Sequence, residues 1–544
     1  MTSEPPSVTP RDGQLLEKSR GPDGVVLAVD HGTSSVKVSL VTVHGQILGT
    51  ASEKTPIHFF SGGGAEQDPG DWWNALVRAS SALLSERLVP EDRIIAIGVS
   101  STFSSTVAVD LHGVHLMSSP TWMDSRGAPY VRKIMSGFPS MAGYGLLNVL
   151  RWIPKTAGGP TLSGKDDIAH VLLIKNEFPE IYNKTYMFLP SKDYLNLRLT
   201  GKFAASYDSM TLFWVLNTRD INKIHYDTNL ISRLGIEPEK LPPLKPSTEI
   251  LGTLSSKAAD ELGLPQSVKV VVGSPDHQCA CVGSGAVRDY EGHVYVGTSS
   301  WVQCIVPFKK TDVFHSIASL PTAIPGRYYC ANEQDLAGGC LTFLAENILF
   351  SGDNLRGERP TEDPYSLMDR LAANSPPGSG KLIFTPWLNG ERTPVDDGSL
   401  RGGLYNISTT TTLSQIVRAF FEGVAYNTRW SLRYVEKFIG RRMDQLSFVG
   451  GGAKSAVWCQ IFADVLNRSI RQVQDPQQAN ARGAAFIAAV GLGCIRFEDI
   501  PNLIQYGSTY RPNPDNRRIY DELFQEFLGI YRANKSMFRR LNQQ

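Results

Sequence analysis

The sequence lacks an excess of charge of either sign and lacks any long apolar run. Lysine and arginine number 54 against 53 for aspartate and glutamate, which leaves a net charge of +1. A chain balanced in this way has no broad electrostatic attraction for nucleic acid or for an anionic membrane. No stretch of about 18 consecutive apolar residues occurs, and the polar, proline-rich start lacks the apolar core of a signal peptide. We therefore expect neither a nucleic-acid nor a membrane partner.

Cysteine is also scarce. All seven cysteines lie between Cys279 and Cys494, and none of them forms the C-x-x-C pairs of a zinc site. An odd number of cysteines without such spacing is typical of reduced, mostly buried thiols. This pattern predicts a cytoplasmic protein.

The length of the chain predicts two large domains. It has 544 residues, whereas a single hydrophobic core stops growing at roughly 250–300 residues. A hydrophobic fraction of 42% and a charged fraction of 20% are those of an ordinary folded protein. Residues 1–23 are polar and without periodicity, so we expect a disordered tail, whereas residues 71–88 have the pattern of an amphipathic helix.

A short internal repeat relates the two halves. A β-branched run at 25–29 ends in Asp30 and leads into Gly-Thr-Ser-Ser at 32–35, and a second apolar run at 293–296 leads into the same four residues at 297–300. Each copy follows a predicted strand near the start of a candidate domain. The repeat therefore predicts two related domains that face each other.

The repeated turn has a chemistry of its own. A Gly-Thr-Ser turn exposes successive backbone N–H groups and two hydroxyls, which suits phosphate oxygens, although a tight hairpin would use the same residues. Asp30 could hold the hydration shell of Mg²⁺, or it could simply form a turn. The Walker-type G-x-x-x-x-G-K-[ST] pattern and the H-R-D set of protein kinases are both missing. If ATP is used, another fold must bind it.

Two later glycine-rich stretches add candidates. Three glycines at 450–452 join an apolar strand to a predicted helix, where they could press against a nucleotide, or they could form a flexible turn. The stretch GERTP at 390–394 has the composition of a surface loop with charged ends.

These stretches occur in one order along the chain and together resemble the FGGY family of carbohydrate kinases, members of the actin-like ATPase superfamily. The resemblance covers residues 25–510 and rests on VDHGTS at 29–34, SPDH at 274–277, VGTS at 296–299, GERTP at 390–394 and GGGAKS at 450–455, supported by EQDP at 66–69, WMDSR at 122–126 and PSKDY at 190–194. It implies an α/β fold of two ribonuclease-H-like domains, each a mixed sheet flanked by helices, with an interdomain cleft. The expected bounds are 24–287, 288–512 and a C-terminal helix at 513–544.

The resemblance also implies roles for individual residues. It makes Asp276 the general base that accepts the proton of the sugar hydroxyl, with ATP and Mg²⁺ as cofactors and Asp30 on the metal side. The nucleotide-contacting residues that it implies are Thr33, Ser34, Gly297, Thr298, Ser299, Gly451, Gly452, Lys454 and Ser455.

The sugar side departs from the family pattern. Xylulose kinases carry Gln-Met-His where this chain has Thr-Phe-Ser at 102–104, so Phe103 and Ser104 are expected to reshape the pocket. Asp124 and Arg126 could bind sugar hydroxyls or form an internal salt bridge. His277 replaces an asparagine common in pentulose kinases and is taken as a substrate residue beside Asp276. His170, which stands at a family lysine, is expected to be packed or exposed and not catalytic.

These departures leave the substrate open. A pentulose such as xylulose or ribulose leads, with polyols of the erythritol or glycerol type and heptuloses as alternatives. A non-catalytic sugar- or nucleotide-sensing relative and a general ATPase of the actin or chaperone type are alternatives of other classes. The expected partners are a small sugar and ATP, and a homodimer is open.

Overall fold

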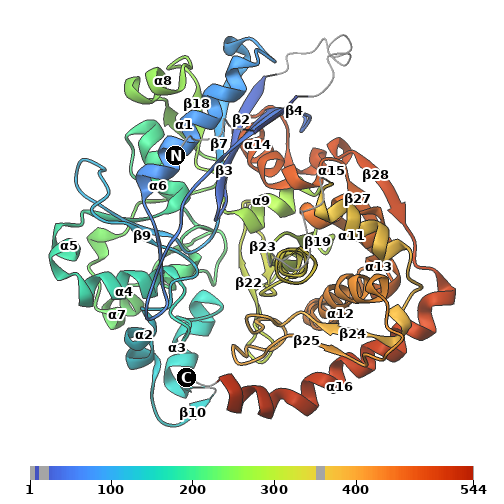
Figure 1. Ribbon diagram of the computed structural model, residues 1–544. Coiled ribbons are helices and arrows are strands. Elements are labelled where there is room, and N and C mark those ends of the chain that lie inside the picture. The colour runs from blue at the N-terminus through green and yellow to red at the C-terminus, as the bar shows by residue number, and fades with distance from the viewer. Residues whose placement is uncertain (1–6, 11–23, 142, 351–361, 543–544) are drawn as a thin grey trace.

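Two lobes, each built around a large mixed sheet, make up the molecule (Figure 1). The computed structural model describes residues 7–10, 24–141, 143–350 and 362–542. Within these residues no helix combines the length and the apolar character that a membrane span requires.

The first sheet is built around strand β2 (Val25–His31). This strand pairs antiparallel with β3 (Ser35–Thr42) across the Gly-Thr-Ser turn and parallel with β7 (Ile94–Ser101) on its other side. The full order is β1-β4-β3-β2-β7-β18-β17, with β1 at Ser7–Pro10, β4 at Ile47–Lys54, β18 at Lys269–Val271 and β17 at Ile250–Thr253.

The second sheet repeats this arrangement. Strand β19 (Gly292–Val296) pairs antiparallel with β20 (Ser300–Val306) across the second Gly-Thr-Ser turn and parallel with β26 (Gln445–Val449). The internal repeat is thus a repeat of structure, with the turn at the same place in each sheet. The order is β21-β22-β23-β20-β19-β26-β27-β28, the other strands being β21 Thr311–Asp312, β22 Ile317–Pro321, β23 Tyr328–Ala331, β27 Ser469–Val473 and β28 Tyr506–Tyr510.

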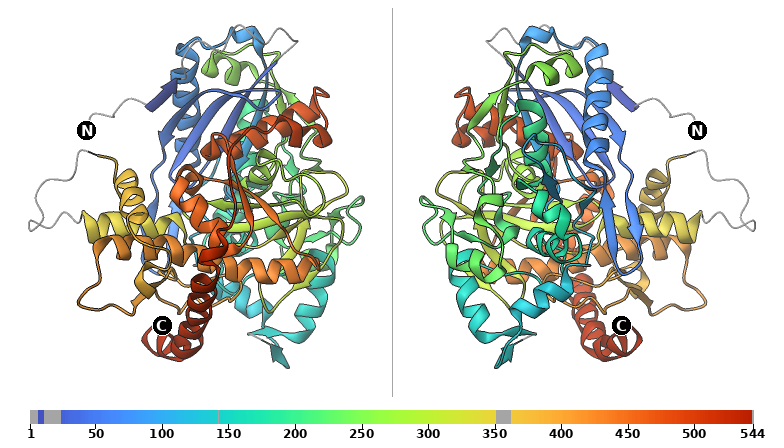
Figure 2. Two further views of the ribbon diagram at one scale, coloured as in Figure 1. Left: turned by 90° about the vertical axis from the view of Figure 1, so that its right-hand side faces the viewer. Right: turned by 90° about the vertical axis from the view of Figure 1, so that its left-hand side faces the viewer.

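Helices cover both faces of the first sheet. Because successive side chains of a strand point to opposite faces, Val25, Leu27 and Val29 join the cluster that contains α1, α6 and α8, whereas Val26 and Ala28 join the cluster that contains α14. Helix α14 comes from the second half of the chain, yet Figure 1 and Figure 2 show it against the blue strands of the first sheet. These helices are α1 Pro69–Ser85, α6 Ser191–Thr200, α8 Ser256–Leu262 and α14 Ala479–Gly491.

Helices α9 (Asp276–Gly283) and α14 cross with almost no space between their backbones. A Cβ added to Gly483 would lie 1.9 Å from the carbonyl oxygen of Cys279, and one added to Gly283 would lie 1.9 Å from that of Ala479. Only glycine fits at either position. The two lobes are therefore joined through a backbone contact, and one hydrophobic cluster contains residues from both sides of residue 287.

The second sheet carries its own helices, and smaller elements complete the lobes. Its helical side includes α11 (Pro364–Ala373), α12 (Leu413–Ile439), α13 (Ala456–Leu466) and the terminal α16 (Arg517–Asn542), which lies within the predicted 513–544 helix. The remaining α-helices are α2 Ala128–Met135, α3 Leu146–Thr156, α4 Asp167–Glu177, α5 Pro179–Lys184, α7 Thr228–Leu234, α10 Gly338–Phe343 and α15 Ile500–Leu503; short strands include β5 His58–Phe60, β6 Gly64–Gln67, β8 Thr106–Val109, β9 Ser119–Pro120 and β12 Met187–Pro190.

Two expectations at the N-terminal end need correction. The predicted disordered tail at 1–23 lies mostly outside the described residues, but its segment Ser7–Pro10 forms strand β1 and pairs antiparallel with β4. Strand β4 would otherwise be an edge whose backbone groups could pair with another strand. The helix predicted at 71–88 begins two residues earlier because Asp68 caps it, accepting a 2.7 Å hydrogen bond from the amide of Gly70.

Candidate active site

The loop that carries Asp276 is anchored from behind by buried polar groups. The carbonyl oxygen of Val272 accepts hydrogen bonds from Nζ of Lys192 at 2.9 Å and from Nδ2 of Asn196 at 2.7 Å. Gly273 follows with φ +74°, and a Cβ there would lie 2.4 Å from the carbonyl oxygen of Val99. These contacts fix the backbone conformation of the loop between strand β18 and helix α9.

A completely buried ionic network holds the same loop. Lys192 pairs with Asp193, and Ser274 donates to the carboxylate of Asp208, which also accepts a 3.1 Å hydrogen bond from Ser247. Burial raises the pKa of both aspartates, and the charge of Lys192 opposes that shift. Removal of the lysine would leave the carboxylates without their cation.

Asp276 is the first residue of α9, where the positive end of the helix dipole favours a negative charge. Its Oδ1 accepts a 2.8 Å hydrogen bond from the amide of His277. Burial raises the pKa of Asp276 well above its usual value, and the negative charges of Asp30 and Glu333 raise it further. The carboxylate is thus a stronger base than an exposed aspartate.

Asp30 is the penultimate residue of strand β2, and its charge acts on Asp276. Its Oδ1 accepts a 3.3 Å hydrogen bond from Nδ2 of Asn480 in α14, and burial raises its pKa despite the nearby charge of Lys37. Two carboxylates close enough to repel each other suit a divalent cation that keeps several waters and needs only one or two protein ligands. The described residues contain no group of three or more His, Cys, Asp or Glu side chains that could enclose a metal. Asp30 and Asp276 therefore suit a Mg²⁺ ion that keeps most of its water ligands, and they do not suit a metal enclosed by protein ligands.

The two Gly-Thr-Ser turns lie at the ends of equivalent strands. In the first turn, Thr33 accepts a 3.0 Å hydrogen bond from the indole of Trp122, while Ser34 is exposed. In the second turn, the amide of Gly297 donates to the carbonyl of Ser299 at 3.0 Å, and Thr298 is exposed. Exposed hydroxyls and turn amides are what a phosphate site requires.

The glycine turn at 450–452 lies directly against the second of these turns. A Cβ on Gly452 would lie 2.6 Å from the Val296 side chain, and one on Gly450 would lie 2.5 Å from the Val296 carbonyl oxygen. Gly451 and Lys454 are exposed. The hydroxyl of Ser455 already has two protein partners, because it caps α13 and donates a 2.7 Å hydrogen bond to Asp369. The structure brings the predicted phosphate and adenosine turns together, with Ser455 in a structural role.

Aromatic rings surround His277. The imidazole stacks on Trp301 at 4.0 Å between ring centroids and meets Phe103 edge-on at 5.5 Å. Ser104 follows Phe103 with φ +54° and is buried. Phe103 and His277, predicted from separate parts of the chain, therefore lie in contact beside the base.

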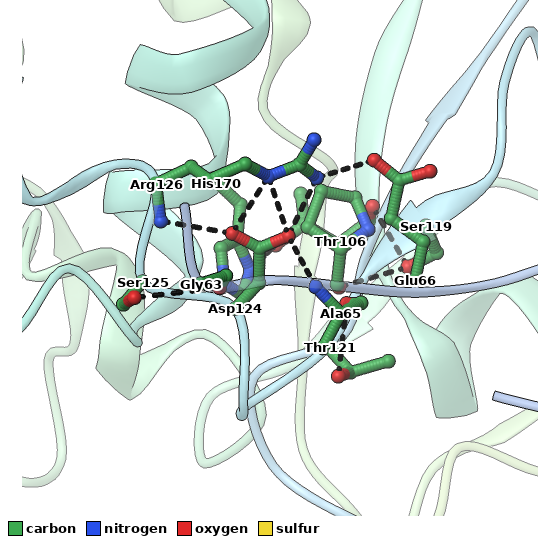
Figure 3. Close-up of polar contacts among 11 residues, drawn as sticks. Gly63, Ala65, Glu66, Thr106, Ser119, Thr121, Asp124, Ser125, Arg126 and His170 are labelled. Atoms are coloured by element: carbon green, nitrogen blue, oxygen red, sulfur yellow. Dashed lines mark hydrogen bonds and ion pairs between the residues drawn. The ribbon is translucent and has the colours of Figure 1, made fainter. Parts of the chain in front are cut away.

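Asp124 and Arg126 form the internal salt bridge that was one of the two alternatives (Figure 3). Asp124 is completely buried, accepts a 3.0 Å hydrogen bond from the amide of Ala65, and pairs with the Arg126 guanidinium. Arg126 also pairs with Glu66. Because both oxygens of Asp124 are used, direct sugar binding by this residue is not supported. In Figure 3 the remaining terminal nitrogen of Arg126 points away from both carboxylates.

His170 is packed, as one of the expected alternatives had it. It is completely buried, and its Nδ1 lies 3.2 Å from the hydroxyl of Thr106. Burial lowers its pKa to about 4, so the ring is neutral.

The stretch at 390–394 is not the surface loop that its composition suggests. Glu391 is buried and accepts hydrogen bonds from the amides of Asp335 and Arg392. Arg392 pairs with Glu333 and Asp335 and places its guanidinium 5.3 Å from the ring centroid of Trp122. A charged residue of the second lobe thus contacts the first lobe near the base.

Several of these residues could not be found from the sequence. Asn480 and Glu333 stand in stretches without a recognisable pattern, and nothing local marks them as partners of Asp30 and Asp276. Lys192 lies in the family-like PSKDY stretch. That resemblance marked the stretch but did not indicate that Lys192 binds the carbonyl of Val272 in the loop that carries Asp276.

Comparison with known proteins agrees with this geometry. Models of the N-terminal and C-terminal domains of the FGGY family of carbohydrate kinases match residues 25–283 and 292–492. A xylulose kinase of Staphylococcus epidermidis is 28% identical over 521 residues, 94% of this chain and 97% of that protein. A gluconokinase of Bacillus subtilis is 25% identical over 95% of this chain and 97% of its own length.

Solved structures show the same fold. The crystal structure of ligand-bound xylulose kinase from Lactobacillus acidophilus aligns with a TM-score of 0.81 at 24% identity, covering 95% of this chain and 100% of that chain. The two-lobed α/β architecture is therefore the actin-like ATPase fold that the family resemblance implied, and its two lobes are the related domains that the repeat predicted. With family models matching both lobes, the chain belongs to the FGGY family of carbohydrate kinases.

Proposed function

We propose that this carbohydrate kinase transfers the γ-phosphate of ATP to a hydroxyl of a ketose, in the first place a pentulose such as xylulose or ribulose. The observation that carries the proposal is Asp276, a carboxylate of raised pKa at the start of α9, beside Asp30 and the first Gly-Thr-Ser turn. The relative from Staphylococcus epidermidis that is named a xylulose kinase supports a pentulose.

Asp276 acts as the general base. A sugar hydroxyl is a weak nucleophile at neutral pH, and a carboxylate of raised pKa accepts its proton more readily as the oxygen attacks phosphorus. A placed base contributes about 10²–10⁴-fold, or roughly 3–5 kcal/mol of barrier. The larger share comes from in-line positioning, which the anchored loop at 272–276 provides.

The nucleotide is held by the turns. Thr33, Ser34, Gly297, Thr298 and Ser299 offer amides and hydroxyls to its phosphates, and the turn at 450–452 with Lys454 offers a flat surface to the adenosine. Asp30 would hold Mg²⁺, and the ion would neutralise phosphate charge.

An aldonate such as gluconate is the second candidate. A relative named gluconokinase covers nearly the whole chain. We name half-buried Lys165 as the residue that would pair with the carboxylate: burial and then the positive charge of Arg392 lower its pKa, and a bound carboxylate would raise that pKa again. Polyols and heptuloses are the remaining candidate substrates. The cytoplasmic location and the homodimer stay predictions.

A coupled ADP-release assay tests the proposal. ATP and Mg²⁺ are supplied with xylulose, ribulose, gluconate, erythritol, glycerol and a heptulose in turn. We expect strong turnover with a pentulose, a loss of kcat of about 10²-fold or more in Asp276→Asn, and unchanged ATP binding. The matched control is Asp260→Asn on the exposed face of α8. Turnover of gluconate alone would select the second candidate, and no turnover with ATP still bound would favour a sensing relative.

A further inference from the structure

A buried glutamine of the second sheet contacts the histidine beside the base. Gln303 lies in β20 and is completely buried. Its side-chain nitrogen lies 2.8 Å from Nδ1 of His277 and 3.3 Å from the carbonyl oxygen of Asn332. No interaction with a ligand is needed for this arrangement, so it belongs to the folded protein itself.

The carbonyl of Asn332 decides how the amide of Gln303 is turned. A backbone carbonyl only accepts hydrogen bonds, so the NH₂ group of Gln303 must face it, since the opposite orientation would set two oxygens against each other. Asn332 is itself held, because its Nδ2 donates to the carbonyl of Val302 at 2.6 Å. The same NH₂ group therefore faces His277, and Nδ1 of His277 must be the acceptor.

A neutral imidazole that accepts at Nδ1 carries its proton on Nε2. Burial lowers the pKa of His277 to about 3, and the positive charge of Arg392 acts in the same direction, so the ring stays neutral at physiological pH. Stacking on Trp301 and the edge contact with Phe103 fix the plane of the ring. Trp301 is fixed in turn, since its indole donates to Nε2 of His293 at 3.1 Å.

The ring of His277 stays partly exposed beside Asp276. Its Nε2 makes no hydrogen bond to any of the residues that the structure describes, so this N–H is available to a molecule in the site. An asparagine at this position could present either its oxygen or its nitrogen, whereas the imidazole presents a donor only.

We propose that Gln303 is a positioning residue that fixes His277 as a one-way hydrogen-bond donor, so that the site selects a substrate with an acceptor oxygen, such as a ketose carbonyl or a hydroxyl lone pair, next to the reacting hydroxyl. This inference rests on the proposed function for its substrate, but the proton position on His277 is a property of the protein alone. It assigns a role in substrate specificity to Gln303, which lies two residues after Trp301, the ring on which His277 stacks.

The first experiment locates the proton without any substrate. The full chain is labelled with ¹⁵N-histidine, and the ring nitrogens of its ten histidines are observed by NMR. The signals of His277 are identified by their loss in His277→Asn. We expect an unprotonated Nδ1 and a protonated Nε2, and in Gln303→Glu, whose carboxylate can only accept, a proton on Nδ1. A wild-type proton on Nδ1 overturns the proposal.

The second experiment is a double-mutant cycle with whichever sugar the wild type phosphorylates. Gln303→Met removes the donor at nearly constant volume and should lower kcat/KM about 3- to 10-fold, the effect of one neutral hydrogen bond. In a His277→Asn background the same change should cost less than about twofold, because no tautomer remains to be fixed. An equal loss in both backgrounds means that Gln303 is only structural and overturns the proposal.

Failure of the proposed function is distinguished from failure of this inference. If the wild type phosphorylates none of the sugars, the proposed substrate class is wrong, while the NMR measurement still decides the proton position. If Gln303→Glu does not fold, Gln303→Met serves in the NMR experiment as well, with a mixed tautomer as the expected result and an unchanged one as the contrary result.

Discussion

A methyl group at Gly483 should separate the two helices that carry the site. The Cβ of an alanine there would lie 1.9 Å from the carbonyl oxygen of Cys279, whereas real Cβ contacts are essentially never below 3.0 Å. Helices α14 and α9 would therefore have to move apart by at least 1.1 Å, the difference between these two distances. The obstacle is backbone, so no side chain can rotate away.

The size of the effect follows from what the two helices hold. Overpacking of this kind costs about 1–3 kcal/mol, and the better helix propensity of alanine offsets about 0.5–1 kcal/mol. We expect a net loss of stability of up to about 2.5 kcal/mol. The 3.3 Å hydrogen bond from Asn480 to Asp30 cannot survive a further shift of this size, and displacement of a reacting group by about 1 Å lowers kcat on the order of 10²-fold.

The assay is steady-state kcat of Gly483→Ala beside its unfolding in denaturant. Gly529→Ala in α16 is the matched control, since a Cβ there meets nothing nearer than 3.9 Å. The control should keep full activity and gain slightly in stability. A Gly483→Ala enzyme with kcat within about twofold of the wild type would refute the coupling of the helix crossing to the site.

Further perturbations address charge. Because burial and the charge of Asp30 raise the pKa of Asp276, kcat/KM should fall as the pH drops through this raised pKa, and Asp30→Asn should move the fall to lower pH in a pH–rate profile. Asp276→Asn should raise the unfolding temperature at neutral pH, because a carboxyl whose pKa is raised by folding costs stability at any pH above its unfolded pKa; the gain should vanish at a pH where the aspartate is protonated both folded and unfolded. Lys192→Met should cost about 3–5 kcal/mol in denaturant unfolding, because it leaves buried carboxylates unpaired. Asp124→Asn should raise the KM for the sugar more than it lowers kcat, since Arg126 loses the charged partner that orients it; an unchanged KM would remove Arg126 from the sugar side.

The presence of two related domains could be predicted from the sequence because the same strand and turn pattern occurs twice in it. The two Gly-Thr-Ser-Ser turns follow central strands β2 and β19, and each strand pairs antiparallel on one side and parallel on the other. Asp276 was located through the family resemblance of the SPDH stretch at 274–277, and the structure places it after an apolar strand, as the first residue of α9. Its local pattern alone did not mark it as a base.

Local pattern fails where the partner comes from far along the chain. Asp124 and Arg126 looked equally suited to a sugar and to each other, and the amide of Ala65 with the carboxylate of Glu66 decides between these roles. The charged stretch around Glu391 looked exposed because its hydrogen-bond partners lie more than fifty residues away in the chain. Buried polar residues are recognised only once their partners are known.

The covering of the first sheet by α14 bears on how the chain folds during synthesis. Residue numbers 101, at the end of β7, and 479, at the start of α14, differ by 378. At about 5–20 residues per second the ribosome needs roughly 20–75 s to deliver the helix after the central strands have emerged. Throughout that interval the face that carries Val26 and Ala28 lacks its native cover. The nascent chain must therefore hold this apolar surface without aggregation until almost nine-tenths of the chain has been made.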